Sequence, residues 1–424
     1  MLYYENSIVL FCMDKLMKKL KIGRFKRKLI AKLASMHFYG NPSVKLKIVG
    51  VTGTSGKTTT VTLLYQIAKA LGYKVGLIGT VENIIDEEIR PATHTTPGPI
   101  PLNKLLKEMA DKGCEYVFME VSSHAMDQAR VAGIKFVGGI FTNLTQDHFD
   151  YHKNFDNYFK AKKKFFTMLP SDAFALSNID DKYGKKFLED IRAKKVSYGF
   201  DNHGDFYGEV KKLDFNGLQL SFNNEIVNSK LLGKFNAYNL LVAWSASKLL
   251  GFDMGKMKKI LEDIKPPRGR FEHFTSKNGV LVVVDYAHKP DALEKIFSAV
   301  KETKNTNGRI ISIFGCGGDK DPLKRPIMGK IGANFSDIAI FTSDNPRSED
   351  PEKIIEEMKA DLSEEEFKKV ISISDRHKAI AEAVRIAKSG DIILCAGRGH
   401  EVDQEIKGVK YHFNDMEELR KILN

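Results

Sequence analysis

The sequence has few cysteines for its length, and none of them is placed for a metal or disulfide framework. Its 424 residues include only four, Cys12, Cys114, Cys316 and Cys395, which lie far apart and form no C-x-x-C pair. A zinc site or a disulfide scaffold is therefore not expected, and the chain suits a reducing compartment.

Long apolar runs, internal repeats and low-complexity segments are also missing. No stretch approaches the roughly 18 uncharged apolar residues that a membrane-spanning helix needs, so we do not expect an integral membrane protein. Apolar residues make up 42% and charged residues 28%, which is ordinary for globular proteins. This composition excludes a wholly disordered, collagen-like or coiled-coil protein, and the length allows two or three domains.

The net charge of +12 is concentrated at one end of the chain. Residues 1–33 contain nine lysines and arginines and two acids, a net +7. The rest is nearly balanced, so we expect no nucleic-acid partner. The apolar stretch precedes the basic residues and no cleavage site follows, which is not typical of a signal peptide. Apolar residues at helical spacing predict a basic amphipathic helix that docks on its own domain, with peripheral contact to an anionic membrane as the alternative.

From Leu46 onward, strand-like and helix-like segments alternate. Strands are predicted at 47–53, 74–80, 116–124 and 137–144, with a helix at 58–72. This alternation favours a parallel sheet with ligands at the carboxyl ends of its strands. Short antiparallel strands are expected over 200–230, and a helix over 237–250.

A linker is predicted at Pro266–Gly269, after which the alternation of strands and helices restarts. We therefore predict an α/β protein with a central domain built on a parallel sheet, followed by a Rossmann-like C-terminal α/β domain. The glycine-rich stretch GTSGKT at residues 53–58 makes the central one a P-loop ATPase domain. The predicted boundaries are 1–45 for a basic helical segment, 46–265 for the central domain and 266–424 for the C-terminal domain.

A glycine-rich loop follows the first predicted strand and opens a helix, which is the context in which such loops bind phosphate. Its glycines let backbone N–H groups turn toward phosphate oxygens, and the helix N-terminus favours negative charge. We expect Lys57 to neutralise the β- and γ-phosphates and the Thr58 hydroxyl to bind Mg²⁺. The strict pattern has a glycine where this chain has Val51. The expected ATP-binding residues are Gly53, Thr54, Ser55, Gly56, Lys57, Thr58 and Thr59.

The loop alone predicts an NTPase or a kinase-like enzyme, and a series of further motifs narrows the choice. In chain order they are FYGNPSVKLKIVGVTGTSGKTTT, THTTPGP, MEVSSHAMDQARV, TNLTQDHFDYH, YFKAK, GKFNAYNLL, PPRGRFE, VVDYAHKPD, FGCGGDKDPLKRPIM, SDNPRSEDP and AGRGHE. Over residues 37–410 this series resembles the Mur ligases, specifically the MurE type. Ligases of that type begin with a domain for the uridine end of their substrate, which has no counterpart in residues 1–45.

The resemblance implies an ATP-dependent amide ligase. A substrate carboxylate attacks the γ-phosphate of ATP to give an acyl phosphate, and an amine then displaces phosphate. Both steps need charge to be neutralised around crowded oxygens. In the family, a lysine four residues after a tyrosine is carbamylated, and Tyr158 and Lys162 have that spacing. The resemblance therefore makes Lys57, Glu120, His148 and Lys162 catalytic, with Mg²⁺ held by Thr58, Glu120, His148 and the Lys162 carbamate.

Each of these roles has a plainer alternative. Glu120 could be an ordinary carboxylate at a strand end, and Lys162 could belong to a solvated basic helix face with Lys163 and Lys164. Ser122-Ser123-His124 invites a nucleophilic triad, but no nucleophile elbow surrounds it.

The resemblance also implies substrate contacts. ATP would lie between the two domains, which close around it, although Pro266-Pro267 could instead be a plain spacer. Its further contacts would be Asn236 and Asn239 near the adenine, Arg270 at the phosphates, Asp285 at the ribose, and Lys289. The UDP-muramoyl-dipeptide would contact Thr95, Thr96, Ser122, Gln128 and Arg130, whose hydroxyl, amide and guanidinium groups suit a sugar, peptide amides and carboxylates.

The amine is predicted from the DNPR motif, which resembles that of MurE enzymes that use meso-diaminopimelate. Arg347 can grip the second carboxylate of diaminopimelate, and lysine would leave this guanidinium unpaired. Glu401 would hold the distal ammonium, and Arg325 would add positive charge. The alternative for Arg347 is a surface salt bridge. The expected diaminopimelate contacts are Arg325, Asp344, Asn345, Arg347, Gly397 and Glu401.

We therefore predict a monomeric, cytoplasmic ligase of peptidoglycan precursor synthesis that uses ATP and Mg²⁺ to add diaminopimelate to the D-glutamate carboxyl group. One alternative is the same mechanism on another acceptor or amine, as in lysine-adding, pseudomurein-type or folylpolyglutamate-type ligases. Others are a non-catalytic ATP-binding partner of a ligase complex and a GTPase switch, although no N-K-x-D signal for guanine appears.

Overall fold

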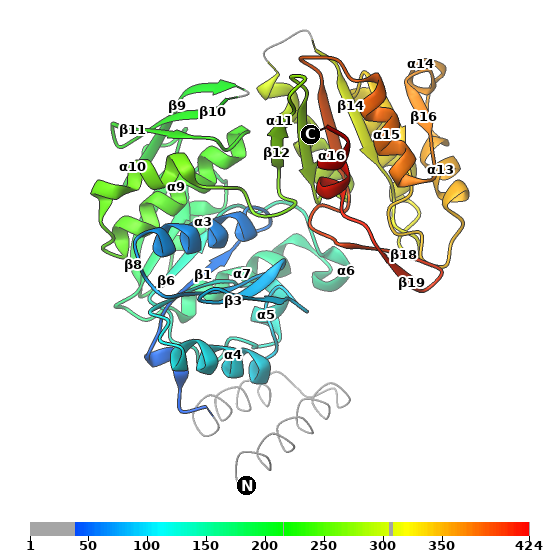
Figure 1. Ribbon diagram of the computed structural model, residues 1–424. Coiled ribbons are helices and arrows are strands. Elements are labelled where there is room, and N and C mark those ends of the chain that lie inside the picture. Colours follow the sequence, from blue (N-terminus) through cyan, green and yellow to red (C-terminus); the bar gives the residue numbers. More distant parts are fainter. Residues whose placement is uncertain (1–38, 215, 305–307, 424) are drawn as a thin grey trace. The chain divides into compact units, whose positions relative to one another are not determined.

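The structure is a computed structural model that describes residues 39–214, 216–304 and 308–423 (Figure 1). The predictions made for residues 1–33 lie outside this range. The chain divides into two compact units after Lys265: the second unit takes the chain from Pro266 onward, together with the short segments 212–218 and 231–234. No helix in the described part is both long enough and apolar enough to cross a membrane.

The larger sheet has eleven strands within the described residues, in the order β11-β10-β9-β8-β7-β6-β1-β5-β2-β3-β4. Its central strands are parallel, whereas β3 pairs antiparallel with both β2 and β4. The strands are β1 (Lys47–Thr52), β2 (Val75–Ile78), β3 (Glu82–Ile85), β4 (Glu88–Pro91), β5 (Tyr116–Glu120), β6 (Gly138–Phe141), β7 (Phe174–Asn178), β8 (Lys194–Gly199), β9 (Phe206–Asp214), β10 (Gly217–Phe222) and β11 (Glu225–Ser229).

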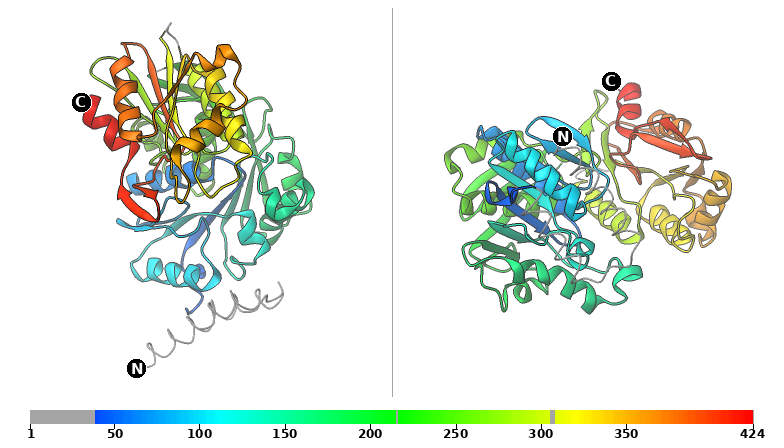
Figure 2. Two further views of the ribbon diagram at one scale, coloured as in Figure 1. Left: turned by 90° about the vertical axis from the view of Figure 1, so that its right-hand side faces the viewer. Right: turned by 90° about the horizontal axis from the view of Figure 1, so that it is seen from below.

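Helices pack on this sheet (Figure 2). They are α3 (Lys57–Ala70), α4 (Pro99–Asp111), α5 (Ser123–Asp127), α6 (Phe149–His152), α7 (Phe155–Met168), α8 (Gly184–Leu188), α9 (Lys234–Leu249) and α10 (Met257–Asp263), with 3₁₀ turns η2 (Pro42–Val44) and η3 (Met254–Lys256). Leu102 and Leu106 of α4 join Phe165 and Phe166 of α7 in one buried apolar cluster.

Two glycines in the central strands let α7 approach the sheet closely. A Cβ atom at Gly50 of β1 would lie 2.4 Å from the Phe165 ring, and one at Gly139 of β6 would lie 2.7 Å from Leu169. Any larger side chain would push the helix outward, because buried cores have no spare volume. This close packing brings Lys162, on the same helix, to the end of β1.

The second unit contains a six-stranded sheet in the order β12-β13-β17-β14-β15-β16, parallel except for the edge pair β12–β13, and a separate antiparallel hairpin β18–β19. Its strands are β12 (Glu272–Thr275), β13 (Leu281–Asp285), β14 (Ile310–Phe314), β15 (Ile338–Phe341), β16 (Val370–Ser372), β17 (Ile392–Ala396), β18 (Asp403–Ile406) and β19 (Val409–His412). Its helices are α11 (Pro290–Thr303), α12 (Lys324–Phe335), α13 (Pro351–Lys359), α14 (Glu364–Phe367), α15 (Arg376–Ile386) and α16 (Asp415–Leu423).

Separate apolar clusters of the second unit involve alternate residues of the same strands. Leu281 and Val283 belong to a cluster with residues of α11, α12 and α13, whereas Val282 and Val284 belong to one with residues of α15 and α16. Alternate residues of a strand face opposite sides of a sheet, so helices cover both faces. The predicted α/β architecture is thereby confirmed.

Candidate active site

The phosphate loop connects β1 to α3 and needs glycine at two positions. Gly53 has φ 149°, and a Cβ there would lie 1.9 Å from Oγ1 of Thr142. Gly56 precedes α3 in the left-handed conformation, and a Cβ there would lie 2.8 Å from Oδ1 of Asn239. Val51, the departure from the strict motif, is buried inside β1 and not in the loop.

The loop is braced by the segment that follows β6. The backbone N–H of Thr54 donates to the carbonyl of Asn143 (2.8 Å), and the N–H of Ser55 donates to its side-chain oxygen (2.9 Å). The Thr54 hydroxyl lies 3.0 Å from the hydroxyl of Tyr158. Lys57 folds back over the loop and donates to the carbonyls of Gly53 (2.9 Å) and Thr54 (2.8 Å). The turn is therefore rigid, and it ends at the N-terminus of a helix, where anions bind favourably.

Glu120, at the end of β5, is fully buried and surrounded by hydroxyl and amide donors. Its Oε1 accepts from the Thr58 hydroxyl (2.9 Å) and the Thr80 amide (2.8 Å), and its Oε2 accepts from the Thr80 hydroxyl (3.1 Å). Thr58 and Glu120 thus present two oxygen atoms side by side, which is the donor type that Mg²⁺ prefers. Among the described residues, no group of three or more histidine, cysteine, aspartate or glutamate side chains forms a metal site.

Lys162 is enclosed beneath the phosphate loop. Only 2% of the residue is exposed, and its Nζ donates to the carbonyl of Gly53 (2.7 Å) and lies 4.8 Å from the centre of the Tyr158 ring. Burial, followed by the nearby charge of Lys57, holds the pKa of Lys162 well below its ordinary value. The shift favours the neutral amine relative to an exposed lysine, and a neutral amine is a nucleophile.

His148 is less enclosed than Lys162. It adopts a left-handed conformation just before α6, and its Nε2 lies 3.4 Å from Oδ2 of Asp147. Its ring is edge-on to that of His124, with centroids 4.9 Å apart, and 6.2 Å from that of Tyr158. Tyr158 thus lies beside both His148 and Lys162.

Hydrogen bonds link four of the five residues expected to bind the acceptor, Thr96, Ser122, Gln128 and Arg130, and Thr96 joins them to the carbonyl of Glu120. The Thr96 hydroxyl donates to this carbonyl (2.8 Å) and accepts from the amide of Ser122 (3.1 Å). Arg130 donates to the Thr96 carbonyl (2.6 Å) and grips Oε1 of Gln128 with two nitrogens. A last contact joins Thr95 to Thr80, the partner of Glu120 (3.0 Å).

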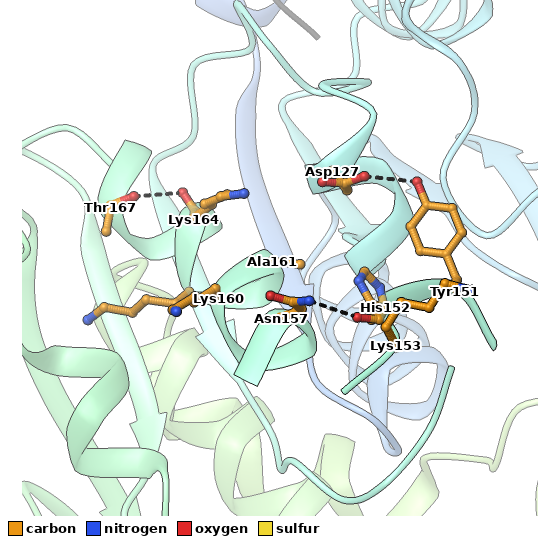
Figure 3. Close-up of a pocket in the computed structure, with 10 residues that line it drawn as sticks. Asp127, Tyr151, His152, Lys153, Asn157, Lys160, Ala161, Lys164 and Thr167 are labelled. Atoms are coloured by element: carbon orange, nitrogen blue, oxygen red, sulfur yellow. Dashed lines mark hydrogen bonds between the residues drawn. The ribbon is translucent and has the colours of Figure 1, made fainter. Parts of the chain in front are cut away.

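A surface hollow adjoins this acceptor cluster (Figure 3). Tyr151 donates to Asp127 across it (2.9 Å) and also accepts from Gln128 (3.4 Å). Two lysines of the hollow have protein partners: Lys163 donates to the backbone carbonyls of Lys186 and Phe187 in α8, and Lys160 pairs with Asp156. The residues that line the hollow are Asp127, Tyr151, His152, Lys153, Asn157, Lys160, Ala161, Lys163, Lys164 and Thr167.

The two serine hydroxyls of the Ser122-Ser123-His124 motif have partners outside the motif. The Ser122 hydroxyl accepts from the amide of Ala125 and caps α5, and the Ser123 hydroxyl lies 3.0 Å from Nε2 of the buried His152. Both serines thus have structural partners.

The residues predicted to contact the nucleoside lie in both units. In the first, Asn236 and Asn239 are buried on α9 and hydrogen-bonded to each other (3.0 Å). In the second, Asp285 accepts from the amides of Phe271 and Ala287 (both 2.8 Å), and burial raises its pKa to about 6. The same unit places Arg270 over the ring of Tyr286 (4.8 Å), and Lys289 just before α11.

The residues predicted for diaminopimelate gather at the carboxyl ends of β15 and β17. Asn345 donates to Oε2 of Glu401 (2.7 Å) and to Oδ1 of Asp344 (3.2 Å). Gly397 has φ 113°, and a Cβ there would lie 2.7 Å from Oδ2 of Asp344. Arg347 donates to the carbonyl of Gly318 (2.6 Å). Burial, and then Asp344, raises the pKa of Glu401.

The two arginines of this set differ in their surroundings. Arg347 is partly exposed, and its Nε lies 3.8 Å from Oε2 of Glu405. Arg325 is 1% exposed, and its guanidinium is held by Glu349 and Glu357. The charge of Arg325 is thus offset by two protein carboxylates, so its predicted contact with the substrate has no support from this geometry.

Sequence reasoning did not single out several partners of these residues. Thr80, Asn143, Arg398 and Glu405 contact Glu120, the phosphate loop, Asn345 and Arg347, respectively. Arg398 and Asn143 stood inside quoted motifs, AGRGHE and TNLTQDHFDYH, whereas Thr80 and Glu405 did not. All four make these contacts across the fold.

Both units match known protein families. Residues 51–247 match the Mur ligase middle domain, and residues 269–399 match the Mur ligase glutamate ligase domain. A Phocaeicola vulgatus protein named UDP-N-acetylmuramoyl-L-alanyl-D-glutamate–2,6-diaminopimelate ligase is 52% identical over 93% of this chain and 81% of its own length. A protein of the same name from Bacteroides thetaiotaomicron is 51% identical over 93% and 82%. A solved structure of a ligase with that name is 31% identical, with a TM-score of 0.68 over 94% of this chain and 82% of the other.

Proposed function

This chain belongs to the Mur ligase family, and on that basis we propose that it is an ATP-dependent ligase that joins meso-diaminopimelate to UDP-N-acetylmuramoyl-L-alanyl-D-glutamate. The observation that carries the proposal is the 52% identity to a ligase of that name over 93% of the chain. The grouping of Asp344, Asn345, Arg347 and Glu401 supports the choice of amine, because it offers both charge signs to a substrate with two ammonium and two carboxylate groups.

Phosphoryl transfer is assigned to the first unit. The phosphates of ATP bind at the N-terminus of α3, where Lys57 moves from the carbonyls of Gly53 and Thr54 to the more negative phosphate oxygens. Thr58 and Glu120 would hold Mg²⁺, which supplies positive charge against the phosphate oxygens when it is bound. The acceptor carboxylate, aligned by Thr96, Ser122 and Arg130, attacks the γ-phosphate, and ADP leaves.

We propose that Lys162 is carbamylated, as the resemblance implies. The support is its burial, its lowered pKa and its place beneath the Gly53 carbonyl. The neutral amine attacks CO₂ and one proton is released, so an uncharged side chain becomes an anion. The hydrogen bond from Nζ to Gly53 can persist, because a carbamate retains one N–H. His148 remains a proposed metal ligand.

The second unit holds the amine. The Glu401 carboxylate pairs with the distal ammonium of diaminopimelate, and Arg347 pairs with the distal carboxylate. The reacting amino group displaces phosphate from the acyl phosphate and forms the amide bond. Because ATP and the UDP-muramoyl-dipeptide are nucleotides made and used inside cells, we propose a cytoplasmic location. The monomeric state stays a prediction.

Lysine as the amine is the alternative that the structure favours most. Arg347 has protein partners in the Gly318 carbonyl and Glu405, so bound lysine would not leave its guanidinium without one. Discrimination between diaminopimelate and lysine then depends mainly on the binding free energy gained when Arg347 contacts the second carboxylate of diaminopimelate. It depends less on the cost of leaving Arg347 unpaired when lysine binds.

The test is phosphate release from ATP with Mg²⁺ in complete mixtures and in mixtures that lack one substrate. We expect release only when the UDP-muramoyl-dipeptide and diaminopimelate are both present. Phosphate release that requires the dipeptide, and that occurs with lysine but not with diaminopimelate, would contradict the choice of amine. No release in any mixture, with protein that binds ATP, would contradict the ligase assignment.

A further inference from the structure

Arg398 lies inside the second unit, against the residues proposed to hold the amine. It follows β17 and is 0% exposed. One terminal nitrogen donates to Oδ1 of Asn345 (3.1 Å), and the other donates to the carbonyls of Asp403 (2.8 Å) and Phe413 (3.0 Å). The guanidinium therefore joins the DNPR loop to both ends of the β18–β19 hairpin.

These contacts fix which way the Asn345 amide faces. Its Oδ1 accepts from Arg398 and from the backbone N–H of Glu405 (2.8 Å). A flipped amide would turn its NH₂ group against two donors, so the oxygen must stay on that side. The NH₂ group consequently faces Glu401, to which it donates at 2.7 Å.

Arg398 also supplies charge to Glu401. Its Nη1 lies 3.7 Å from Oε2 of that carboxylate, while its Nε lies 4.0 Å from Oδ1 of Asp415. Asp415 is already gripped by two nitrogens of the buried Arg376. Arg398 is thus the buried cation next to Glu401, whose own burial disfavours its charged form.

We propose that Arg398 is a positioning residue for the amine substrate: it fixes the Asn345 amide, and that amide aims the Glu401 carboxylate at the substrate ammonium. The inference rests on the proposed function of the second unit. It predicts that loss of Arg398 weakens amino-acid binding selectively, because neither ATP nor the UDP-muramoyl-dipeptide depends on the aim of Glu401.

A purely structural role would give a different result. If Arg398 only ties the hairpin to the domain, its loss lowers the melting temperature and affects all substrates alike. The matched control is Arg309→Met, because Arg309 is another arginine of the second unit and pairs with Asp391 and the carbonyl of Ile386, outside the amine site.

The experiment measures KM for each substrate, kcat, the melting temperature, and the calorimetric Kd for meso-diaminopimelate. In Arg398→Met, we expect KM and Kd for diaminopimelate to rise about tenfold or more, with KM for ATP and for the dipeptide unchanged within about twofold. Arg398→Lys keeps the charge but not the forked donors, so Kd should remain raised severalfold. Arg309→Met should lower the melting temperature without changing Kd.

Asn345→Asp is the second variant, for the case in which Arg398→Met does not fold. It keeps an oxygen for Arg398 and the Glu405 amide, but it replaces the donor to Glu401 with an oxygen. We expect the same selective loss of diaminopimelate binding. Normal Kd for diaminopimelate in either folded variant, or a parallel loss of affinity for all three substrates, would overturn the inference.

The calorimetric measurement separates this inference from the proposed function. If wild-type protein binds diaminopimelate but forms no product, the proposed reaction fails, and the ratio of the Kd values still decides the role of Arg398. If wild-type protein binds no diaminopimelate, both are overturned.

Discussion

The hydroxyl of Thr58 donates a 2.9 Å hydrogen bond to Oε1 of Glu120, which joins the first turn of α3 to the end of β5. The two strands concerned, β1 and β5, are parallel neighbours, and Val51 pairs with Glu120. The register of the sheet therefore holds α3, which follows β1, next to the Glu120 carboxylate at the end of β5. This places a hard-oxygen donor pair beside the phosphate loop.

The first prediction concerns Glu120. Glu120→Gln keeps the shape and one acceptor oxygen but removes the charge, so kcat should fall by about 10²–10³-fold and half-saturation should need more Mg²⁺. Titration of phosphate release with Mg²⁺ checks this. Glu115→Gln, at an exposed position just before the same strand, is the control and should behave as wild type. Equal Mg²⁺ dependence in Glu120→Gln and wild type would contradict the metal assignment.

The second prediction concerns Lys162. Protein equilibrated with ¹³C-bicarbonate should show one buried carbamate signal, which Lys162→Met should lack. The same variant should lose at least about 100-fold in kcat, because a proposed ligand of the catalytic Mg²⁺ is missing. Lys160→Met is the matched control, since Lys160 is exposed on the same helix and pairs with Asp156.

Two results would contradict the carbamate. One is wild-type kcat in Lys162→Met, and the other is full activity of the wild type with no carbamate signal. A fall in the melting temperature alone would leave Lys162 as a support for the Gly53 carbonyl, to which its Nζ donates.

The third prediction concerns pH. Burial raises the pKa of Asp285 to about 6 in the folded protein, against roughly 3.9 when unfolded. Between these values the folded state binds more protons, so this carboxyl group lowers the free energy of unfolding as the pH rises from about 4 to about 6, by up to about 3 kcal/mol. Urea unfolding of wild type and Asp285→Asn should show a stability difference that changes over this interval and is constant above it. A difference that is constant from pH 4 to 8 would show that Asp285 is not perturbed.

The fourth prediction concerns Arg347 and its partner Glu405. Arg347→Met should raise KM for diaminopimelate by about 10–100-fold, because a charge-assisted contact is lost, and should leave any use of lysine unchanged. Glu405→Gln removes the protein carboxylate beside Arg347, so KM for diaminopimelate should fall a few-fold. Steady-state kinetics with each amine checks both. Unchanged KM for diaminopimelate in Arg347→Met would contradict the grip on its distal carboxylate.

The sequence was sufficient to predict β1, β2, β5 and β6 of the larger sheet, β13 to β17 of the smaller sheet, and the phosphate loop, whereas β7, β8 and β12 were not predicted. Buried apolar runs such as 281–285 and 310–314 have few alternatives to a central strand, and Gly53 and Gly56 mark a turn that no other residue fits. The hairpins β3–β4 and β18–β19 were not predicted. Both carry exposed residues, so their pattern does not distinguish them from loops.

The candidate site was predictable as a set of residues but not as a set of contacts. Arg325 stands in a motif, and only the fold shows that Glu349 and Glu357 occupy its guanidinium. The same applies to Thr80, whose amide reaches Glu120 from 40 positions away. Partners of this kind come from tertiary packing, which spacing along the chain does not encode.

A competition between amines tests most directly whether the protein ligates meso-diaminopimelate. Wild-type protein is given ATP, Mg²⁺, UDP-N-acetylmuramoyl-L-alanyl-D-glutamate, and equal concentrations of meso-diaminopimelate and lysine, and the products are identified by mass. We expect one main product, the diaminopimelate adduct, formed in a 1:1:1 ratio with ADP and phosphate. A lysine adduct as the main product, or ADP formed without either adduct, would contradict this expectation.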